Sequence, residues 1–208
     1  PESGAGAPGR LKTPTDFVGE VYRLASSGGT GGIGSLAIHD TMRAPATWLR
    51  AAGEDWRDLV GCRFPVLMPF DPRAVIEDPA VVTLWARCGL TWAVLDLGSG
   101  DDDLRASLGV RHSAGDVSGA AKILAANRVN VLVRALVGLP GETEALTKRT
   151  EYFVGAVKPA RIDVRVWRPA PGTAIYQVAK SRGLIADDSM VEPTGTVPPG
   201  RPWVRGID

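Results

Sequence analysis

Arg134 interrupts the apolar run from Val129 to Gly138, and the stretch VGLPGE then places Val137, Gly138 and Glu142 where that run ends. A buried guanidinium is costly without a partner, so Arg134 is expected to reach solvent, a carboxylate or a ligand. Its planar fork suits a bidentate hold on a carboxylate. The structural alternative is an internal ion pair with Asp96 or Asp163. Glu142 lies close to the start of the next helix, where its charge is favourable regardless of function.

Oxygen-bearing side chains end two other apolar runs. His39 and Asp40 close IGSLAIH, and Asp96 and Ser99 lie at the end of TWAVLDL. A carboxylate can accept a charge-assisted hydrogen bond from an ammonium group, and a carboxylate with a hydroxyl suits a ligand rich in hydroxyls. The alternatives are a helix cap for Asp40 and an ordinary half-buried histidine for His39.

Arg165 and Trp167 alternate with Val164 and Val166 in a fifth apolar run. On a strand of period two, one set faces the interior of the sheet and the other faces its helices. If Arg165 and Trp167 point inward, they line the mouth where a substrate would bind. If they point outward, they are surface charge and helix packing.

Helices and strands alternate along the whole chain. Thr13, Pro14 and Asp16 give the first helix a cap, a first-turn proline and an acid three residues after the cap. Asp116 is expected to cap the fourth helix. The expected helices are 13–25, 44–61, 78–89, 116–128, 143–157 and 171–183, and the expected strands are 33–39, 63–68, 91–97, 129–138 and 161–170.

This alternation predicts an α/β fold with a parallel sheet and right-handed crossovers. Five strands are too few for a closed eight-stranded barrel, and the first helix should follow a strand, so we expect one more strand upstream. An open doubly wound sheet and a truncated eight-stranded barrel are the alternatives. The glycines of GTGGIG (29–34) precede a strand instead of following one, which favours a flexible turn over a dinucleotide fingerprint.

The composition is that of a globular protein. The chain has 208 residues, 44% of them hydrophobic and 23% charged, with a net charge of +1. This near-neutral charge favours neither nucleic acid nor an anionic membrane as partner. The sequence has no apolar run of membrane-spanning length and no signal-peptide core, so a cytoplasmic protein is expected. Two cysteines without paired spacing and two histidines favour no metal site in this chain.

Four stretches, in this order, resemble radical S-adenosylmethionine (SAM) enzymes. LKTPTDFVGEVYRL resembles the helix after their cluster loop, and EDPAVVTLWARCGLTWAVLDLGSGDDDLRASLG resembles their fourth strand with its flanking helix and turn. VNVLVRALVGLPGETEAL is similar to their fifth strand and its turn. VWRPAPGTAIYQVAKSRGLI is similar to the sixth strand and following helix of the cobalamin-dependent subgroup. The resemblance covers about residues 10 to 186.

The resemblance implies a partial (β/α)6 TIM-like barrel over residues 13–186, after a flexible lead-in (1–12) and before an irregular tail (187–208). It implies SAM bound at the carboxyl edge of the strands, and a 4Fe-4S cluster after a first strand that this chain lacks. An upstream cobalamin-binding domain would assist methylation of an unactivated carbon in a small-molecule or peptide substrate. The 208-residue chain alone would then be inactive.

The resemblance also implies roles for the candidate residues. His39 and Asp40 would contact the methionine amino group, Asp96 and Ser99 the ribose, and Arg134 the methionine carboxylate. Val137 and Gly138 would approach the adenine through their backbone, and Arg165 and Trp167 would face the substrate.

Two departures from the family pattern leave alternatives open. No C-x-x-x-C-x-x-C motif occurs, and Gly98 stands where the family's Glu-Ser-Gly turn has its acid. Truncation before Pro1 would explain the first departure. A cobalamin-independent radical SAM enzyme, and a degenerate barrel without a cluster that serves as a binding or scaffold module, are the alternative functions.

Overall fold

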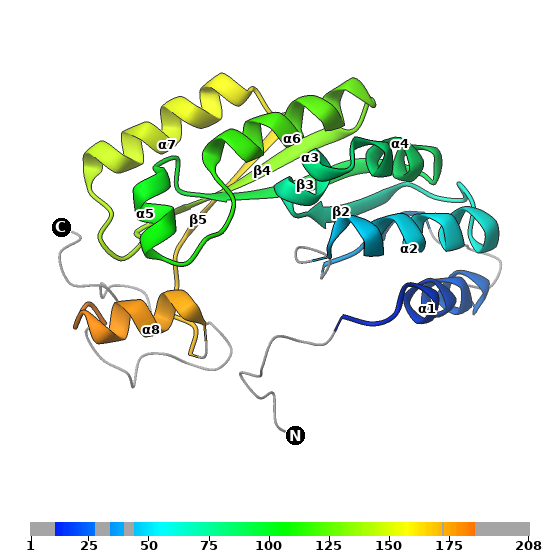
Figure 1. Ribbon diagram of the computed structural model, residues 1–208, viewed down its shortest axis with the longest axis horizontal. Coiled ribbons are helices and arrows are strands. Elements are labelled where there is room, and N and C mark those ends of the chain that lie inside the picture. The colour runs from blue at the N-terminus through cyan, green and yellow to red at the C-terminus, as the bar shows by residue number, and fades with distance from the viewer. Residues whose placement is uncertain (1–10, 28–33, 40–43, 172, 186–208) are drawn as a thin grey trace.

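Five parallel strands form one curved sheet in the computed structural model, which describes residues 11–27, 34–39, 44–171 and 173–185 (Figure 1). The strands follow their chain order across the sheet, and each pairs in parallel with the next. They are β1 (Leu36–Ala37), β2 (Val66–Phe70), β3 (Leu90–Gly98), β4 (Asn130–Val137) and β5 (Arg161–Val166). This arrangement confirms the predicted α/β class and the partial, open barrel.

Eight helices connect or flank these strands in the described residues. They are α1 (Pro14–Ser27), α2 (Ala46–Leu59), α3 (Pro72–Glu77), α4 (Pro79–Arg87), α5 (Asp102–Ser107), α6 (Ala114–Ala126), α7 (Glu144–Val157) and α8 (Ala174–Ser181). The short helix α3 was not predicted, because six residues are too few to show a helical period. The start of α5 was indicated by the acidic residues Asp101, Asp102 and Asp103, which predict a turn and the first turn of a helix. Their caps are nonetheless local: Asp71 accepts from the Arg73 N–H group and Asp101 from that of Leu104.

The expected cap of α6 was wrong by one turn. Ser113 is the N-cap, and it accepts a hydrogen bond from the backbone N–H of Asp116. The Asp116 carboxylate accepts in return from the Ser113 backbone N–H, at 2.8 Å. Asp116 is therefore the third helical residue of a capping box, which satisfies two backbone N–H groups at once.

The main hydrophobic core lies between the sheet and its covering helices. Trp56 and Trp85 are both fully buried, with ring centroids 5.3 Å apart, and they join α2 to α4. Gly53 weakens α2 as an isolated helix, but a Cβ at this position would lie 2.8 Å from Leu84 Cδ2. The glycine thus relieves a close approach of the two helices, since any larger residue would displace the Leu84 side chain.

A second, smaller core holds α8 at the carboxyl edge of the sheet. Its buried members are Leu104 of α5, Leu108 just after that helix, Leu139, Trp167 and Ala179. Because α8 packs there, it leaves the outer face of β5 open, where Ile162, Val164 and Val166 are exposed. Figure 1 shows α8 beside the end of β5 and close to α5, apart from the layer formed by α6 and α7.

In the described parts of the chain, no helix has both the length and the apolar character needed to cross a bilayer. The predicted lead-in and tail, residues 1–12 and 187–208, lie almost wholly outside the described residues, as does most of GTGGIG. Their predicted character stays a prediction.

Candidate functional site

The two faces of the sheet differ in burial, which identifies its open side. On β4, Val131, Val133 and Ala135 are buried against helices, whereas Leu132, Arg134 and Leu136 are only partly buried. On a strand these sets point to opposite faces. The second set therefore lies on the concave side of the curved sheet, where a partial barrel leaves room for a ligand.

A row of charged side chains crosses this concave face, from the carboxyl half of β3 to the middle of β4 and β5. Asp96 of β3 is the register partner of Arg134, and Arg134 is the register partner of Asp163 on β5. Arg134 Nη1 lies 3.2 Å from Asp96 Oδ1, and its Nε lies 3.6 Å from Asp163 Oδ2. Arg165 Nε donates to Asp163 Oδ2 at 2.8 Å. Both ion pairs considered for Arg134 are thus present.

The ion pairs of Arg134 leave hydrogen-bonding capacity unused. Asp96 Oδ1 and Arg134 Nε are both buried atoms, yet neither makes a hydrogen bond within the described part of the chain. Burial raises the pKa of the Asp96 carboxyl, and the attraction of Arg134 opposes this only in part. A polar ligand that supplied the missing hydrogen bonds would therefore be favoured here.

The end of β3 is shaped by a bulge that contains Gly98. The register between β3 and β4 shifts between Asp96 and Gly98, and Gly98 has φ = +68°. A residue with a side chain would be strained at this position, whereas glycine adopts the conformation freely. Within the described residues, the conformation of β3 accommodates glycine here and offers no acidic side chain.

His112 supports this bulge and was not singled out from the sequence. Its Nε2 lies 2.7 Å from the carbonyl oxygen of Asp96. Burial lowers the pKa of His112, and the nearby Arg105 lowers it further, which favours the neutral ring with Nε2–H as donor. Because His112 and Asp96 are 16 positions apart and belong to different elements, no local pattern could have paired them.

Ser99 is fully buried behind the sheet edge. Its hydroxyl accepts from the backbone N–H of Asp101 and lies 3.5 Å from Thr150 Oγ1 on α7. Gly100 donates its N–H to the same threonine oxygen at 2.8 Å. The structure thus places Ser99 in the turn between β3 and α5, packed against α7, and its predicted ribose contact remains untested.

The turn after β4 is organised by Glu142. Its Oε2 accepts from the N–H groups of Gly138, at 2.6 Å, and Leu139, at 3.1 Å. Gly138 and Gly141 have φ values of +75° and +86°, which glycine adopts without strain. Val137 and Gly138 are partly buried at this turn. The carboxylate is therefore a structural acceptor that holds the backbone of the turn, more specific than the helix-start charge inferred from sequence.

The remaining candidate residues lie at different depths. Arg165 is exposed on the concave side, whereas Trp167 is buried in the second core and donates its backbone N–H to the Val137 carbonyl. His39 follows β1 and is exposed, and Asp40 lies outside the described residues. The structure brings Asp96, Arg134 and Arg165 into one row and packs Trp167 beside its end.

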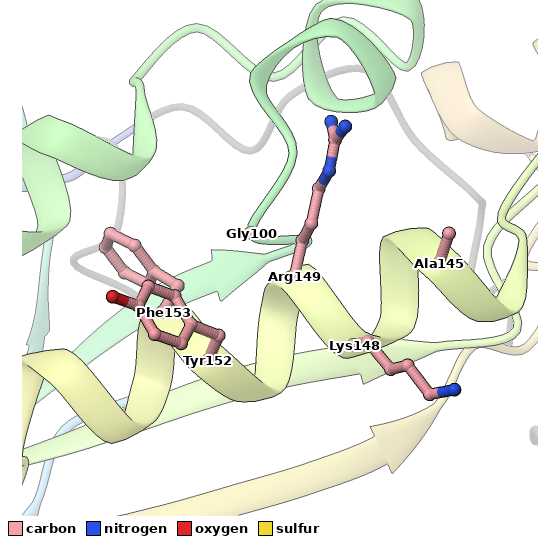
Figure 2. A pocket seen from close by; sticks show the side chains of 6 residues that line it. All are labelled: Gly100, Ala145, Lys148, Arg149, Tyr152 and Phe153. Carbon is pink, nitrogen blue, oxygen red and sulfur yellow. The ribbon is translucent and has the colours of Figure 1, made fainter.

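A cavity of about 390 Å³ lies beside α7, away from the charged row. Figure 2 shows Lys148 and Arg149 leaving α7 in different directions near Gly100. Both cations already have acidic partners, since Lys148 pairs with Glu144 and Arg149 with Asp101, each at 2.6 Å. The cavity therefore presents no free charge for a ligand, and the candidate site remains the concave face.

The two cysteines lie at the opposite edge of the sheet. Cys62 precedes β2 and Cys88 precedes β3, so both are at the amino ends of the strands. No group of three or more metal-ligating side chains occurs in the described ranges. An iron–sulfur cluster is held by several cysteine thiolates, so the described residues of this chain do not fit one.

The fold resembles those of solved radical SAM enzymes. Coproporphyrinogen III oxidase from Escherichia coli, a radical SAM enzyme, matches 93% of this chain at 12% identity, with a TM-score of 0.62. TsrM from Kitasatospora setae, a radical SAM methyltransferase solved with cobalamin and a [4Fe-4S] cluster, matches 84% at 15% identity and a TM-score of 0.66. OxsB, a cobalamin-dependent radical SAM enzyme, matches 80% at 10% identity and a TM-score of 0.54.

This chain covers 44% of the first of these proteins, 35% of the second and 24% of the third. No protein-family model matches the sequence, and no curated protein matches it. At identities this low the likeness shows a shared fold, while the chemistry of this chain has to be argued from its own residues.

Proposed function

We propose that this chain is the SAM-binding barrel of a radical SAM enzyme, and that the intact enzyme is a cobalamin-dependent methyltransferase. The observation that carries the proposal is the row Asp96–Arg134–Asp163 on the open face of the sheet. It reaches toward the carboxyl edge of the sheet through Asp96 of β3 and, beside Asp163, Arg165 of β5. Parallel α/β folds bind their ligands at that edge. SAM carries an ammonium, a carboxylate and a ribose diol, and the row offers both signs of charge with unused hydrogen bonds.

Each candidate residue has a role in this proposal. Arg134 holds the methionine carboxylate through its guanidinium, and Asp96 accepts from the ammonium group or the ribose. The turn at Val137 and Gly138 borders the adenine and is held by Glu142. His39, Asp40 and Ser99 are retained as weaker candidates for the ligand contacts described above.

The substrate binds beyond the cofactor, on the β5 side. Arg165 faces it directly, and Trp167 supports the end of the strand from within the second core. Reductive cleavage of SAM requires a 4Fe-4S cluster, whose ligands would come from outside these 208 residues. In this proposal the chain's own residues bind and orient SAM, and methyl transfer through cobalamin depends on an upstream domain.

Calorimetric titration of the chain with SAM and with 5′-deoxy-5′-methylthioadenosine, which lacks the amino acid group, tests the central contact. Arg134→Lys should weaken SAM binding about tenfold or more, because a lysine cannot make the bidentate contact, and should leave the second ligand unaffected. Arg161→Lys is the matched control, since Arg161 is an exposed residue at the amino end of β5. Its affinities should match those of the unaltered chain.

Equal losses for both ligands would show that Arg134 acts on the fold and not on the carboxylate. Absence of binding to either ligand would favour the degenerate, cluster-free module instead, an alternative that Gly98 supports because it removes the family's acid. Methyl transfer by the intact protein, measured with and without methylcobalamin, separates the cobalamin-dependent enzyme from a cobalamin-independent one.

A further inference from the structure

β5 is an open edge of the sheet within the described residues. It is last in the strand order and pairs only with β4. The backbone N–H of Trp167 donates to Val137 on β4 at 2.7 Å. Because backbone groups alternate sides along a strand, the odd-numbered residues of β5 face β4 and the even-numbered ones face the open edge. Ile162, Val164 and Val166 therefore point their N–H and C=O groups away from the sheet.

The same three residues also form an exposed apolar stripe. Ile162, Val164 and Val166 are 48%, 59% and 61% exposed. An unpaired edge with a row of exposed β-branched side chains can pair with a strand of another chain. Proteins normally prevent such pairing by covering the edge or by placing charged residues on it. The stripe itself contains no charge, so a partner that adds a strand would satisfy the backbone and place its own side chains beside the stripe as cross-strand neighbours.

We propose that this partner is a second copy of the chain, paired antiparallel through β5 with Val164 opposite Val164. The even-numbered residues must form the hydrogen-bonded pairs, since only they face the edge. Two registers meet this condition and keep most of the strand paired. In one, Val164 lies opposite Val164 of the second copy, and in the other, Asp163 lies opposite Asp163.

Charge decides between the two registers. Centring on Asp163 places the two Asp163 carboxylates directly opposite each other. Centring on Val164 places Asp163 opposite the partner's Arg165, twice by symmetry, and Ile162 opposite the partner's Val166. These charged residues are the non-hydrogen-bonded pairs, whose Cα atoms are only about 4.5 Å apart, so opposite charges are favoured and like charges are not.

The dimer continues the charged row of the concave face into the partner. Asp163 already accepts from Arg165 of its own strand at 2.8 Å. In the dimer it also meets the partner's Arg165, so each copy contributes a cation to the outer end of the other copy's row. The contact uses the same surface on both copies and closes as a two-fold dimer instead of a fibre. It shares Arg165 with the proposed substrate face, but it does not depend on SAM binding.

Disulfide trapping tests the register. In a Cys62→Ser background, which removes the exposed native thiol, Val164→Cys should form a covalent dimer on mild oxidation. Its two Cα atoms would be about 5.5 Å apart, within the range that a disulfide spans. Ile162→Cys is the matched control: it lies on the same stripe but faces Val166, so it should not cross-link. Equal cross-linking of both variants would overturn the register.

Sedimentation velocity tests the dimer itself. The unaltered chain should sediment at twice 21.9 kDa. Val164→Lys places two like charges opposite each other and should raise the dimer dissociation constant more than about tenfold. Tyr152→Lys, a change to lysine at a still more exposed position on α7, should leave it unchanged. A monomer at concentrations up to about 100 µM, or a dimer indifferent to Val164→Lys, would overturn the proposal.

Discussion

Single polar side chains hold the carboxyl edge of this sheet in shape. Glu142 collects the N–H groups of Gly138 and Leu139, and His112 lies against the carbonyl of Asp96 at the β3 bulge. Both side chains bond to backbone, so they position the edge instead of reacting with anything bound there. The chemical candidates, Asp96 and Arg134, differ because their side chains lie on the concave face, and their charged groups are paired with each other and not with backbone.

Removing the carboxylate of Glu142 should destabilise the fold. Glu142→Ala leaves two backbone N–H groups of the turn without their acceptor, at a cost of about 1–3 kcal/mol in the free energy of unfolding. Glu144→Ala is the control, because Glu144 is exposed and pairs only with exposed Lys148. Its cost should stay below about 1 kcal/mol. Urea denaturation of both variants measures the difference, and equal costs would contradict the role given to Glu142.

Stability should fall in mild acid because of His112. Its folded pKa is lowered by burial, so the unfolded chain binds the proton more readily. The contribution of neutral His112 is complete above its unfolded pKa of about 6.5 and is lost as pH falls toward the lower folded pKa. Gln at this position keeps an N–H donor but does not titrate. Thermal melts between about pH 8 and pH 5.5 should therefore show a weaker pH dependence in His112→Gln.

Among the elements, close approach matters more than helix propensity. Gly53 lets α2 pack on α4, and Gly100 lets the turn after β3 pack on α7. A Cβ at Gly100 would lie 2.7 Å from Thr150 Cα and 3.0 Å from the Arg149 carbonyl oxygen. Both atoms belong to a helix backbone, which cannot move aside as a side chain can.

Gly100→Ala should accordingly cost about 1–3 kcal/mol of unfolding free energy by overpacking. Gly155, on the same helix α7, has no atom within 4 Å of its would-be Cβ. Gly155→Ala should be neutral or stabilising by up to about 1 kcal/mol, because alanine is the better helix former. Differential scanning calorimetry of the two variants gives the comparison. A stable Gly100→Ala variant would mean that the turn can shift away from α7.

The helices and strands could be predicted from the sequence more completely than the candidate site, because their signals are local. The cap at Thr13 and the apolar strands could be predicted because their signals span only a few residues. Arg134 and its possible partners could be named because apolar strands rarely contain a charge. The pairing of His112 with Asp96, and the burial of Ser99 and Trp167, depend on contacts between distant elements. No sequence pattern encodes such contacts.

At the scale of the whole molecule, the sheet is curved but open, with charge on one face and an uncovered apolar edge. The order of the strands follows the chain, so each crossover adds one strand and the two ends of the sheet never meet. A site on the concave face is therefore accessible from the side as well as from the carboxyl edge. The proposed dimer contact at β5 and the proposed ligand at Arg134 would therefore both lie on the open side of the sheet.

The separate packing of α8 has a thermodynamic consequence. The helix joins the rest of the described molecule through the small cluster around Trp167 and Leu139, whereas the large core stabilises the sheet and its other helices. Release of α8 would thus expose few apolar side chains and would cost only a fraction of the global unfolding free energy. Detachment of α8 is a partial unfolding that uncovers the ends of β4 and β5 while the sheet stays folded. Access to that corner of the barrel is set by a local equilibrium, which any molecule that binds across α8 would shift toward the closed form.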